Sequence, residues 1–473
     1  MGASFFICLA LVLLIGLSSA RHAKASASDY FVASRSIPPW LVGLSAVATN
    51  NSGYMFIGLI GYTYAVGVQS VWLMVGWIAG DFIASKIAHE RMRDEADRVH
   101  ANGIISLLAR WGGANNRSWQ ILAAVVSVVF LSTYAAAQIS AGGKALEGML
   151  DIPMAIGMGM VALVVIAYSI AGGMRASIWT DAAQSLLMVA SMIVLLFAAV
   201  AHLGGLGRVI EQAGAIDGFL SLTPTGLDIS GVAGPIAFIV GWMFAGAAAL
   251  GQPHIVSRFL ALQDSSQMNR VRIWYYSYYL LFYCFATAVG LLSRLYFGDA
   301  AGFDPEMALP NMARDLLPPW LAGLMLAGIF AATMSTADSL VLSCSSAITQ
   351  DLPKTQSENR WFLKSATAGT TLFALGIGLW SEQSVFSLVV WAWGTLGAAF
   401  VPVLMWNILG SRLGATLRSP AMLAISSTGV VVTVAWKFYG FPDTIYEGAV
   451  GMFIAILMGG IVSLGSIRSR FYP

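Results

Sequence analysis

The stretch Thr49-Asn50-Asn51-Ser52-Gly53 lies in the middle of an apolar run that extends over residues 39–66. A second apolar run, residues 231–252, contains Gly246 and ends directly before Pro253. Glycine loosens a helix and proline removes a backbone donor. Freed backbone groups inside a bilayer are tolerated only where they are buried in protein or line a cavity. Both runs therefore predict transmembrane helices that are interrupted at a site.

The composition of the whole chain is that of a membrane protein. Hydrophobic residues make up 58% of the 473 residues and charged residues only 10%, whereas soluble proteins carry about 25% charged residues. The net charge of +2 does not indicate nucleic-acid binding, which needs clustered cations on one face. Three cysteines without CxxC spacing predict neither a disulfide framework nor a zinc site.

Thirteen runs are long enough to cross a bilayer, which requires about 20 mostly apolar residues. The first run lacks the positive start of a signal peptide and is followed by Arg21 and Lys24, so we expect a first transmembrane helix. The chain is thus expected to be an all-α integral membrane protein. The thirteen runs lie near residues 3–20, 39–66, 69–90, 119–147, 154–172, 178–203, 231–252, 272–296, 318–348, 361–381, 384–408, 420–438 and 446–467.

The distribution of lysine and arginine predicts how the chain is oriented. An odd number of spans puts the termini on opposite sides, and cytoplasmic connections carry the excess of cations. With the N-terminus outside and the C-terminus in the cytoplasm, only five of the 25 cations fall on the outer side: Lys144, Arg208, Arg294, Arg314 and Lys437. We expect a multi-pass protein of the cell (inner) membrane. Its connections are too short to hold a catalytic or signalling domain, so no enzyme activity is expected.

The two interrupted spans lie five helices apart, so spans 2–6 and 7–11 would form two halves of opposite orientation. Interrupted helices at matching positions of inverted halves are the best sequence indication of a transporter's substrate and ion sites. The alternative is ordinary close packing of helices through small residues, which the 49 glycines of the chain would permit.

Three acidic residues fall within the expected spans, where a carboxylate costs about 2.5–3.5 kcal/mol. Asp81 lies near Lys86, and pairing with that lysine would explain it. Asp181 lies at the start of the sixth span, where the helix dipole would also favour an acid. Asp338 lies deep in the ninth span, on which serines recur at helical spacing: Ser335, Ser339, Ser343 and Ser346. Such oxygen ligands suit sodium, although serine-mediated helix packing is the alternative.

Six short stretches, taken in order, are typical of one family of transporters. They are Asp29-Tyr30-Phe31 with Ser34-Arg35-Ser36, the Ser45–Gly53 stretch, Gly172-Gly173 followed by Trp179-Thr180-Asp181, Gly251-Gln252-Pro253-His254 with Arg258-Phe259, Met334-Ser335-Thr336, and Cys344-Ser345-Ser346-Ala347-Ile348-Thr349. From about Asp29 to the last span, the chain resembles the sodium/solute symporter family, and within it the proline-transporting bacterial branch.

The resemblance implies a fold and a division of the chain. The fold would be a leucine-transporter-like core of two inverted five-helix repeats that works by alternating access. Residues 1–38 would form the first transmembrane helix and a cytoplasmic linker. The transport core would cover residues 39–411, with repeats near 39–203 and 231–411, and two additional helices would occupy residues 412–473.

The resemblance also implies site residues. Its main sodium site would use the backbone carbonyls of Ala48, Asn51 and Ala332 and the hydroxyls of Ser335 and Thr336. A second sodium site, held by some members, falls on Asp181, Ser335, Asp338 and Ser339. The solute pocket falls on Ser52, Gly53, Tyr54, Tyr134, Trp242, Ala245, Ala249 and Pro253.

Two departures from the proline-transporting members affect what the resemblance implies. Those members carry an aspartate important for sodium where this chain has Asn50, and our hypothesis is that Asp338 supplies the missing charge. Their substrate-facing Trp and Tyr align with Ala245 and Ala249. Trp242 replaces the former only if about one helical turn is inserted, so a bulkier or differently shaped solute is an alternative to proline.

We therefore expect a secondary active transporter that couples sodium to the uptake of a small polar solute, with an amino acid such as proline as the leading candidate. Its partners would be the solute, sodium and the bilayer, with no nucleic acid and no obligate protein partner. One alternative is proton coupling on the same fold, with Asp338 or Asp181 titrating. Another is a transporter-like solute sensor, whereas nothing in the chain suggests the repeated filter residues of a channel.

Overall fold

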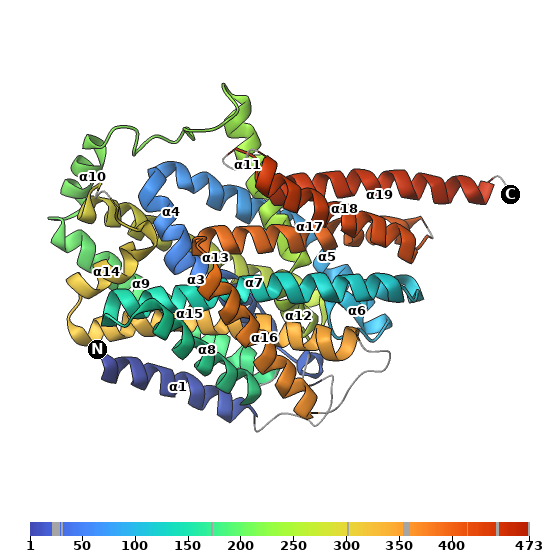
Figure 1. Ribbon diagram of the computed structural model, residues 1–473, viewed down its shortest axis with the longest axis horizontal. Coiled ribbons are helices and arrows are strands. Elements are labelled where there is room, and N and C mark those ends of the chain that lie inside the picture. Colours follow the sequence, from blue (N-terminus) through green and yellow to red (C-terminus); the bar gives the residue numbers. More distant parts are fainter. Residues whose placement is uncertain are drawn as a thin grey trace.

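Helices make up almost the whole structure, a computed structural model that describes residues 1–20, 29, 32–171, 174–299, 302–352, 360–413, 415–440 and 444–471. Most of them run along the longest axis of the molecule, and α1 begins at one end of the bundle whereas α19 ends at the other (Figure 1). A helix satisfies its backbone hydrogen bonds internally, as lipid requires. The unbroken long helices are α1 (Gly2–Ala20), α5 (Val71–Arg98), α7 (Arg117–Leu150), α8 (Met154–Ala171), α9 (Met174–His202), α13 (Met268–Phe297), α15 (Pro319–Ser346), α16 (Arg360–Trp380), α17 (Val385–Arg412), α18 (Ser419–Tyr439) and α19 (Glu447–Phe471).

Short helices and turns connect these elements. Three are α-helical, namely α6 (Ile104–Ala109), α10 (Leu206–Ala215) and α14 (Ala308–Leu316). Among the tighter turns, η1 (Ala33–Arg35), η3 (Gly67–Ser70), η4 (Trp111–Gly113), η6 (Ser265–Gln267) and η7 (Pro305–Met307) are 3₁₀-helical, and η8 (Ala347–Asp351) is a π-helical turn after α15.

The expected all-α membrane class is confirmed, and a helix lies at each of the thirteen expected positions. Within the described residues, nine helical segments are long and apolar enough to cross a membrane, and the first of them, Pro39–Arg98, joins the second and third expected spans. Three shorter apolar helices take the first, fifth and thirteenth positions: Gly2–Val12, Met154–Ala167 and Glu447–Val462. The number of crossings therefore stays a prediction.

The first interruption is confirmed at Ser52. Helix α3 (Pro39–Gly53) reaches this residue, which adopts φ 27° and ψ 178°. A positive φ is uncommon for a residue with a Cβ. The chain then continues through a π-helical turn, η2 (Tyr54–Gly58), into α4 (Leu59–Val66).

The second interruption is confirmed at Gln252. Helix α11 (Ala233–Ala247) tightens into the 3₁₀ turn η5 (Ala248–Gly251), Gln252 is extended, and α12 (Pro253–Leu260) begins on its proline. Proline is favoured at the first position of a helix because no donor is needed there. The Gln252 amide donates to the carbonyls of Ala248 and Trp393 at 3.1 and 2.9 Å. The side chain thus satisfies acceptors freed by the break.

Helix α3 lies at the centre of the arrangement, in contact with α9, α12, α13 and α15. Helices α5 and α11 pack along each other, and glycines bring their backbones together. A Cβ on Gly80 would lie 1.8 Å from the Met243 carbonyl oxygen, and one on Gly246 would lie 1.9 Å from the Trp77 carbonyl oxygen. Small residues at helix crossings permit this approach in membrane proteins. The interrupted helix α11 is thereby held against α5, and the interrupted helix α3 lies against α15.

Candidate functional site

Asp181 of α9 is the centre of a buried hydrogen-bond cluster. Ser45 Oγ of α3 donates to its Oδ2 at 2.6 Å, and Ser335 Oγ of α15 donates to its Oδ1 at 2.7 Å. Helices α3 and α15 are also joined directly, because Thr336 Oγ1 donates to the carbonyl oxygen of Thr49 at 2.8 Å. The carboxylate of Asp181 thus connects the broken helix α3 to the serine-bearing face of α15.

Arg258 of α12 brings a positive charge into the same cluster. Its side chain is 1% exposed, and a guanidinium nitrogen lies 3.4 Å from Asp181 Oδ2. It also donates to Ser177 Oγ at 3.0 Å, to the carbonyl oxygen of His254 at 2.6 Å and to Ser339 Oγ. The sequence motif contains Arg258, but our sequence analysis assigned it no role. Its burial follows from the packing of α12, the helix that begins after the break at Gln252, against α3 and α15.

Asp338 adds a second buried carboxylate beside this pair. It is 3% exposed, its Oδ1 has no hydrogen-bond partner, and it lies within electrostatic range of Asp181 and Arg258. Two ionised carboxylates against one guanidinium leave one negative charge uncompensated. Buried charges are paired or coordinate metals. The group of Asp181, Asp338, Ser335 and Ser339 therefore fits one additional small cation.

The residues expected at the main sodium site lie where α3 contacts α15. All of them are completely buried: Ala48, Asn51, Ala332, Ser335 and Thr336. The Asn51 side chain, one residue before the break, has neither its oxygen nor its nitrogen hydrogen-bonded. Buried polar atoms are normally satisfied, so this amide is available to a ligand. Carbonyl, amide and hydroxyl oxygens at one helix crossing fit a small hard cation.

Three of the expected solute-site residues lie together at the break in α3. Tyr134 Oη donates to Ser52 Oγ at 3.2 Å, and the backbone nitrogen of Gly53 donates to Gln138 Oε1 at 2.8 Å. Both partners come from α7. A Cβ on Gly53 would lie 2.7 Å from Thr333 Cγ2, so α15 closes over the same point. Gln138 is a partner that no local pattern in the sequence indicates.

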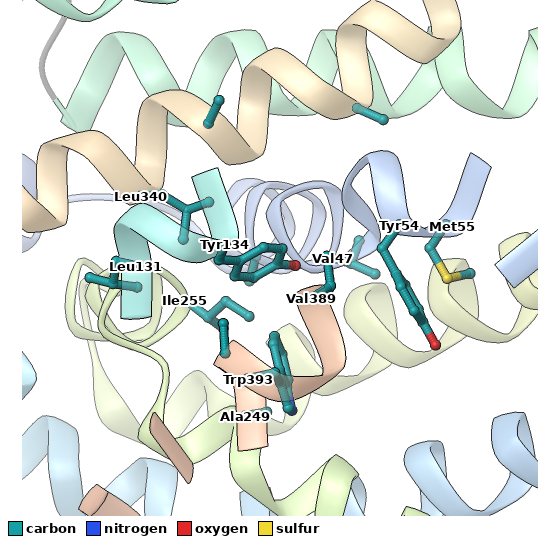
Figure 2. Close-up of a cluster of buried hydrophobic side chains, with 14 of the residues drawn as sticks. Val47, Tyr54, Met55, Leu131, Tyr134, Ala249, Ile255, Leu340, Val389 and Trp393 are labelled. Carbon is teal, nitrogen blue, oxygen red and sulfur yellow. The ribbon is translucent and has the colours of Figure 1, made fainter. Parts of the chain in front are cut away.

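Ala245 and Ala249 lie on the other side of the Tyr134 ring, beside Trp393. The Trp393 indole nitrogen donates to the carbonyl oxygen of Ala245 at 2.7 Å, and its ring meets that of Tyr134 edge-on at 6.3 Å. Figure 2 shows Tyr134, Trp393 and Ala249 within one buried apolar group. Trp393 of α17 thus places an aromatic ring beside Tyr134 and the backbone of Ala245.

His254, which follows Pro253 in the sequence motif, also lies in this region. It is completely buried, and its ring meets that of Tyr134 edge-on at 5.5 Å. Neither ring nitrogen has a hydrogen-bond partner. His254 is therefore a polar group beside the expected solute site that the sequence analysis missed.

The remaining expected solute residues do not join this group. The Tyr54 ring packs between Trp77 and Phe386 at 5.9 and 5.4 Å. Trp242 stacks on Trp77 and Tyr446 and lines a cavity of about 380 Å³. Pro253 instead lines a smaller cavity of about 50 Å³, next to Arg258 and Ser339.

The two cavities lie near opposite ends of α5. Gln69, just before α5, lines the larger cavity, and Asn102, just after α5, lines the smaller one. A helix of 28 residues is about 42 Å long at 1.5 Å per residue. Neither cavity is lined by Tyr134 or Ser52.

The interpretation of Asp81 as a partner of Lys86 is wrong. Lys86 Nζ donates to Asn269 Oδ1 at 2.7 Å instead. Asp81 is 1% exposed and accepts a hydrogen bond from Tyr275 Oη at 2.8 Å. Helical residues five apart lie on different faces, since each step rotates about 100°. Spacings of three or four would have favoured a pair.

Comparisons with known proteins identify the family of the chain. The Sodium:solute symporter family matches residues 30–424. The sodium/proline symporter of Escherichia coli (strain K12) is 30% identical over 494 residues, which cover 99% of this chain and 95% of that protein. The high-affinity proline transporter of Bacillus subtilis (strain 168) is 26% identical over 463 residues, covering 96% of this chain and 95% of that protein.

The fold is shared with a solved transporter structure. A Na+-coupled sialic acid symporter, solved in a substrate-bound outward-open state, superposes with a TM-score of 0.81 at 20% identity, covering 97% of this chain and 96% of that one. The expected leucine-transporter-like fold is thereby confirmed. The chain belongs to the sodium:solute symporter family.

Proposed function

We propose that this multi-pass membrane protein imports proline, or an amino acid of similar size, together with sodium across the cell (inner) membrane. Membership of the family makes it a transporter that couples sodium to a small solute. The single observation that carries the choice of solute is the similarity, over nearly the whole chain, to a sodium/proline symporter and a high-affinity proline transporter. Alternating access would open the larger and the smaller cavity in turn.

The proposed solute site is the group at the break in α3. Ser52, Gly53 and Tyr134 would contact the solute, and Ala245 and Ala249 would border it. Broken helices offer backbone N–H and C=O groups to charged ends of a substrate, which suits the carboxylate and amine of an amino acid. Trp393 supports this assignment because it supplies an aromatic wall beside the two alanines. Trp242, Tyr54 and Pro253 would line the routes to the site from either side.

The proposed main sodium site comprises Ala48, Asn51, Ala332, Ser335 and Thr336. A second sodium is proposed at Asp181, Ser335, Asp338 and Ser339, supported by the uncompensated charge beside Arg258. One sodium gains about 2.3 kcal/mol per 100 mV and about 1.4 kcal/mol from a tenfold gradient. Together these energies support an accumulation of roughly several hundred-fold, and a second ion would square that factor.

We further propose that the two repeats, near residues 39–203 and 231–411, form the moving core, with the N-terminus outside. The excess of lysine and arginine in the connections assigned to the cytoplasm supports this orientation. Labelling single cysteines introduced at Asp217 and at Arg412 in intact cells tests it. Only the first should react with a membrane-impermeant reagent, and the reverse result would invert the topology.

Uptake into proteoliposomes tests the proposed function. An inward sodium gradient should drive accumulation of labelled proline within a panel of amino acids, and no accumulation should occur without it. Ser335→Ala should abolish sodium-driven uptake, because it removes a hydroxyl from both proposed sodium sites. Ser293→Ala is the control, since that buried serine donates only within α13 and to a nearby methionine. Accumulation of a different solute would reject proline, and uptake that ignores sodium would reject the coupling ion.

A further inference from the structure

Asp81 of α5 is a buried acidic group that the proposed sodium and solute sites do not use. It lies ten residues from the start of α5 and seventeen from its end, so it is deep within the bundle. Its carboxylate accepts a hydrogen bond from Tyr275 of α13 at 2.8 Å. Among the described residues, no lysine, arginine or histidine forms an ion pair with it.

The charged groups near Asp81 are engaged elsewhere. On α5 itself, Lys86 donates to Asn269, and His89 is hydrogen-bonded to Ser85 and stacked on Phe259. On α13, the guanidinium of Arg272 donates to Ser85 and forms an ion pair with Glu90. The other ionisable groups of α13 that lie near Asp81 are phenols: Tyr275, Tyr276, Tyr279 and Tyr283.

The remaining elements packed on α5 bring no free cation to Asp81. Residues 233–251, which form α11 and η5, contain no ionisable side chain, and neither do η3, η6 and α6. Helix α12 carries His254 and Arg258, of which Arg258 is paired with Asp181. Helix α17 carries Arg412, at its far end. The carboxylate of Asp81 is therefore surrounded by phenols and apolar groups.

A carboxylate without a cation in such surroundings takes up a proton, because the ionised form loses its hydration without compensation. The reaction converts the carboxylate and one proton from water into a neutral carboxylic acid. Tyr275 Oη remains a hydrogen-bond donor to the other oxygen lone pairs of that acid. Asp181 differs from Asp81 because it lies beside the guanidinium of Arg258 and accepts hydrogen bonds from two serine hydroxyls.

Tyr275 connects Asp81 to the transport site. The Asn50 side-chain nitrogen donates to Tyr275 Oη at 2.5 Å, and Asn50 lies two residues before the break at Ser52. The preceding residue, Thr49, contacts Asp181 on the other side of α3 at 3.4 Å. Movement of this turn of α3 during transport would therefore disturb the hydrogen bonds that hold Tyr275 against Asp81.

We propose that Asp81 is a proton-binding site that Tyr275 and Asn50 connect to the broken part of α3, so that its protonation is linked to transport. This proton site goes beyond the sodium and solute sites, and its link to transport rests on the proposed function. Transport would then respond to pH through a residue that touches neither sodium nor solute.

Two measurements test the proposal. The first is sodium-driven proline uptake into proteoliposomes, with the same pH inside and outside and saturating sodium, for the wild type and Asp81→Asn. A single linked proton can change the wild-type rate by up to about tenfold per pH unit, whereas Asp81→Asn should vary by less than about twofold. Asn keeps the size of Asp and still accepts from Tyr275. Asp217→Asn, at an exposed position, is the control and should keep the wild-type profile.

The second measurement does not depend on uptake. Infrared spectra of the purified wild type at neutral pH should contain a carbonyl band of a protonated carboxyl group that is missing from Asp81→Asn. An Asp81→Asn spectrum identical to that of the wild type would overturn the proton site. A wild-type pH profile in Asp81→Asn would overturn its link to transport. If the wild type shows no sodium-driven proline uptake, the proposed function fails while the infrared result still decides whether Asp81 holds a proton.

Discussion

Asp181 and Asp81 are two buried carboxylates connected to neighbouring residues of α3: Asp181 contacts Thr49 directly, and Asp81 is connected to Asn50 through Tyr275. Asp181 receives hydrogen bonds from Ser45 and Ser335 and lies beside the guanidinium of Arg258. Asp81 accepts a hydrogen bond from Tyr275, which in turn accepts one from Asn50, and Tyr276 also lies in hydrogen-bonding range of Asp81. One carboxylate has its charge compensated in place, and the other does not. Asp181 lies among hydroxyl oxygens and beside the second carboxylate of Asp338, a group of oxygens that suits a metal cation, whereas Asp81 has only phenols and apolar groups around it, which suits a proton.

One turn of α3 contacts both the Asp181 cluster and Tyr275, the partner of Asp81. Thr49 and Asn50 are adjacent, so their side chains point about 100° apart around the helix. Thr49 faces Asp181 and Thr336, and Asn50 faces Tyr275. Because the helix breaks at Ser52, both contacts lie within one turn of the point where α3 can change direction. Sodium, solute and proton would then act on the same short segment.

The largest effect is expected from separating Asp181 and Arg258. Breaking a buried ion pair by removing one partner costs about 3–5 kcal/mol, whereas replacing both by apolar groups can be neutral. Asp181→Ala should abolish uptake and lower the thermal stability in detergent. The double variant Asp181→Ala with Arg258→Met should recover stability but not uptake. A double variant no more stable than Asp181→Ala would show that the two side chains do not compensate each other.

Asp338→Asn tests the charge that is left over at the Asp181 site. The amide keeps the shape of the side chain but removes the uncompensated charge, so sodium should bind at least about tenfold more weakly, a difference of about 1.4 kcal/mol. The measurement is the sodium concentration that gives half-maximal uptake, which should rise in Asp338→Asn. The maximal rate should still be approached at high sodium. Unchanged sodium dependence would reject the hypothesis that Asp338 replaces the charge missing at Asn50.

Tyr275→Phe tests the hydrogen bonds that connect Asp81 to Asn50. The change removes the Tyr275 hydrogen bond to Asp81, which keeps Tyr276 beside it, and leaves Asn50 without its acceptor; an unsatisfied buried polar group costs about 1–3 kcal/mol. Unfolding in detergent should therefore occur at a lower temperature, and uptake should fall several-fold. Substitutions of two residues that share one hydrogen bond do not have additive effects. The double variant of Tyr275→Phe and Asp81→Asn should therefore lose less stability and less uptake than the sum of the two single variants. Additive effects would show that the phenol acts independently of Asp81.

Much of the scaffold could be predicted from sequence, because lipid leaves few options for the backbone. Polar and small residues inside an apolar run indicated the break at Ser52, and the proline after a glycine indicated the one at Gln252. The spacing of the serines placed Ser335 and Ser339 on one face of α15, where the structure has them. Local patterns were sufficient for these features, because each depends on residues close in the chain.

The partners across the bundle could not be predicted in the same way. Trp393 donates to Ala245 across 148 positions of the chain, and Asn50 meets Tyr275 across 225. Arg258 reaches Asp181 because α12 packs against α3 and α15. The sequence motif therefore identified helices that carry the site, whereas the compensation of each buried charge depends on tertiary packing. This is why Asp81 was assigned to Lys86, its neighbour in sequence, and not to Tyr275.

Tyr134→Phe is expected to have the smallest effect, and it tests whether the solute site is distinct from both carboxylates. The change removes one hydrogen bond to Ser52, worth about 0.5–1.5 kcal/mol, which corresponds to a loss of roughly two- to twelvefold in solute affinity. Ser52 keeps a partner, because its hydroxyl still accepts from the backbone nitrogen of Tyr54 at 3.1 Å, and the ring contacts with Trp393 and His254 remain. The concentration of proline that gives half-maximal uptake should therefore rise, while the sodium dependence and the pH profile stay those of the wild type. A change in sodium dependence of the same size would mean that Tyr134 acts through the Asp181 cluster, and that the solute and sodium sites share one hydrogen-bond network.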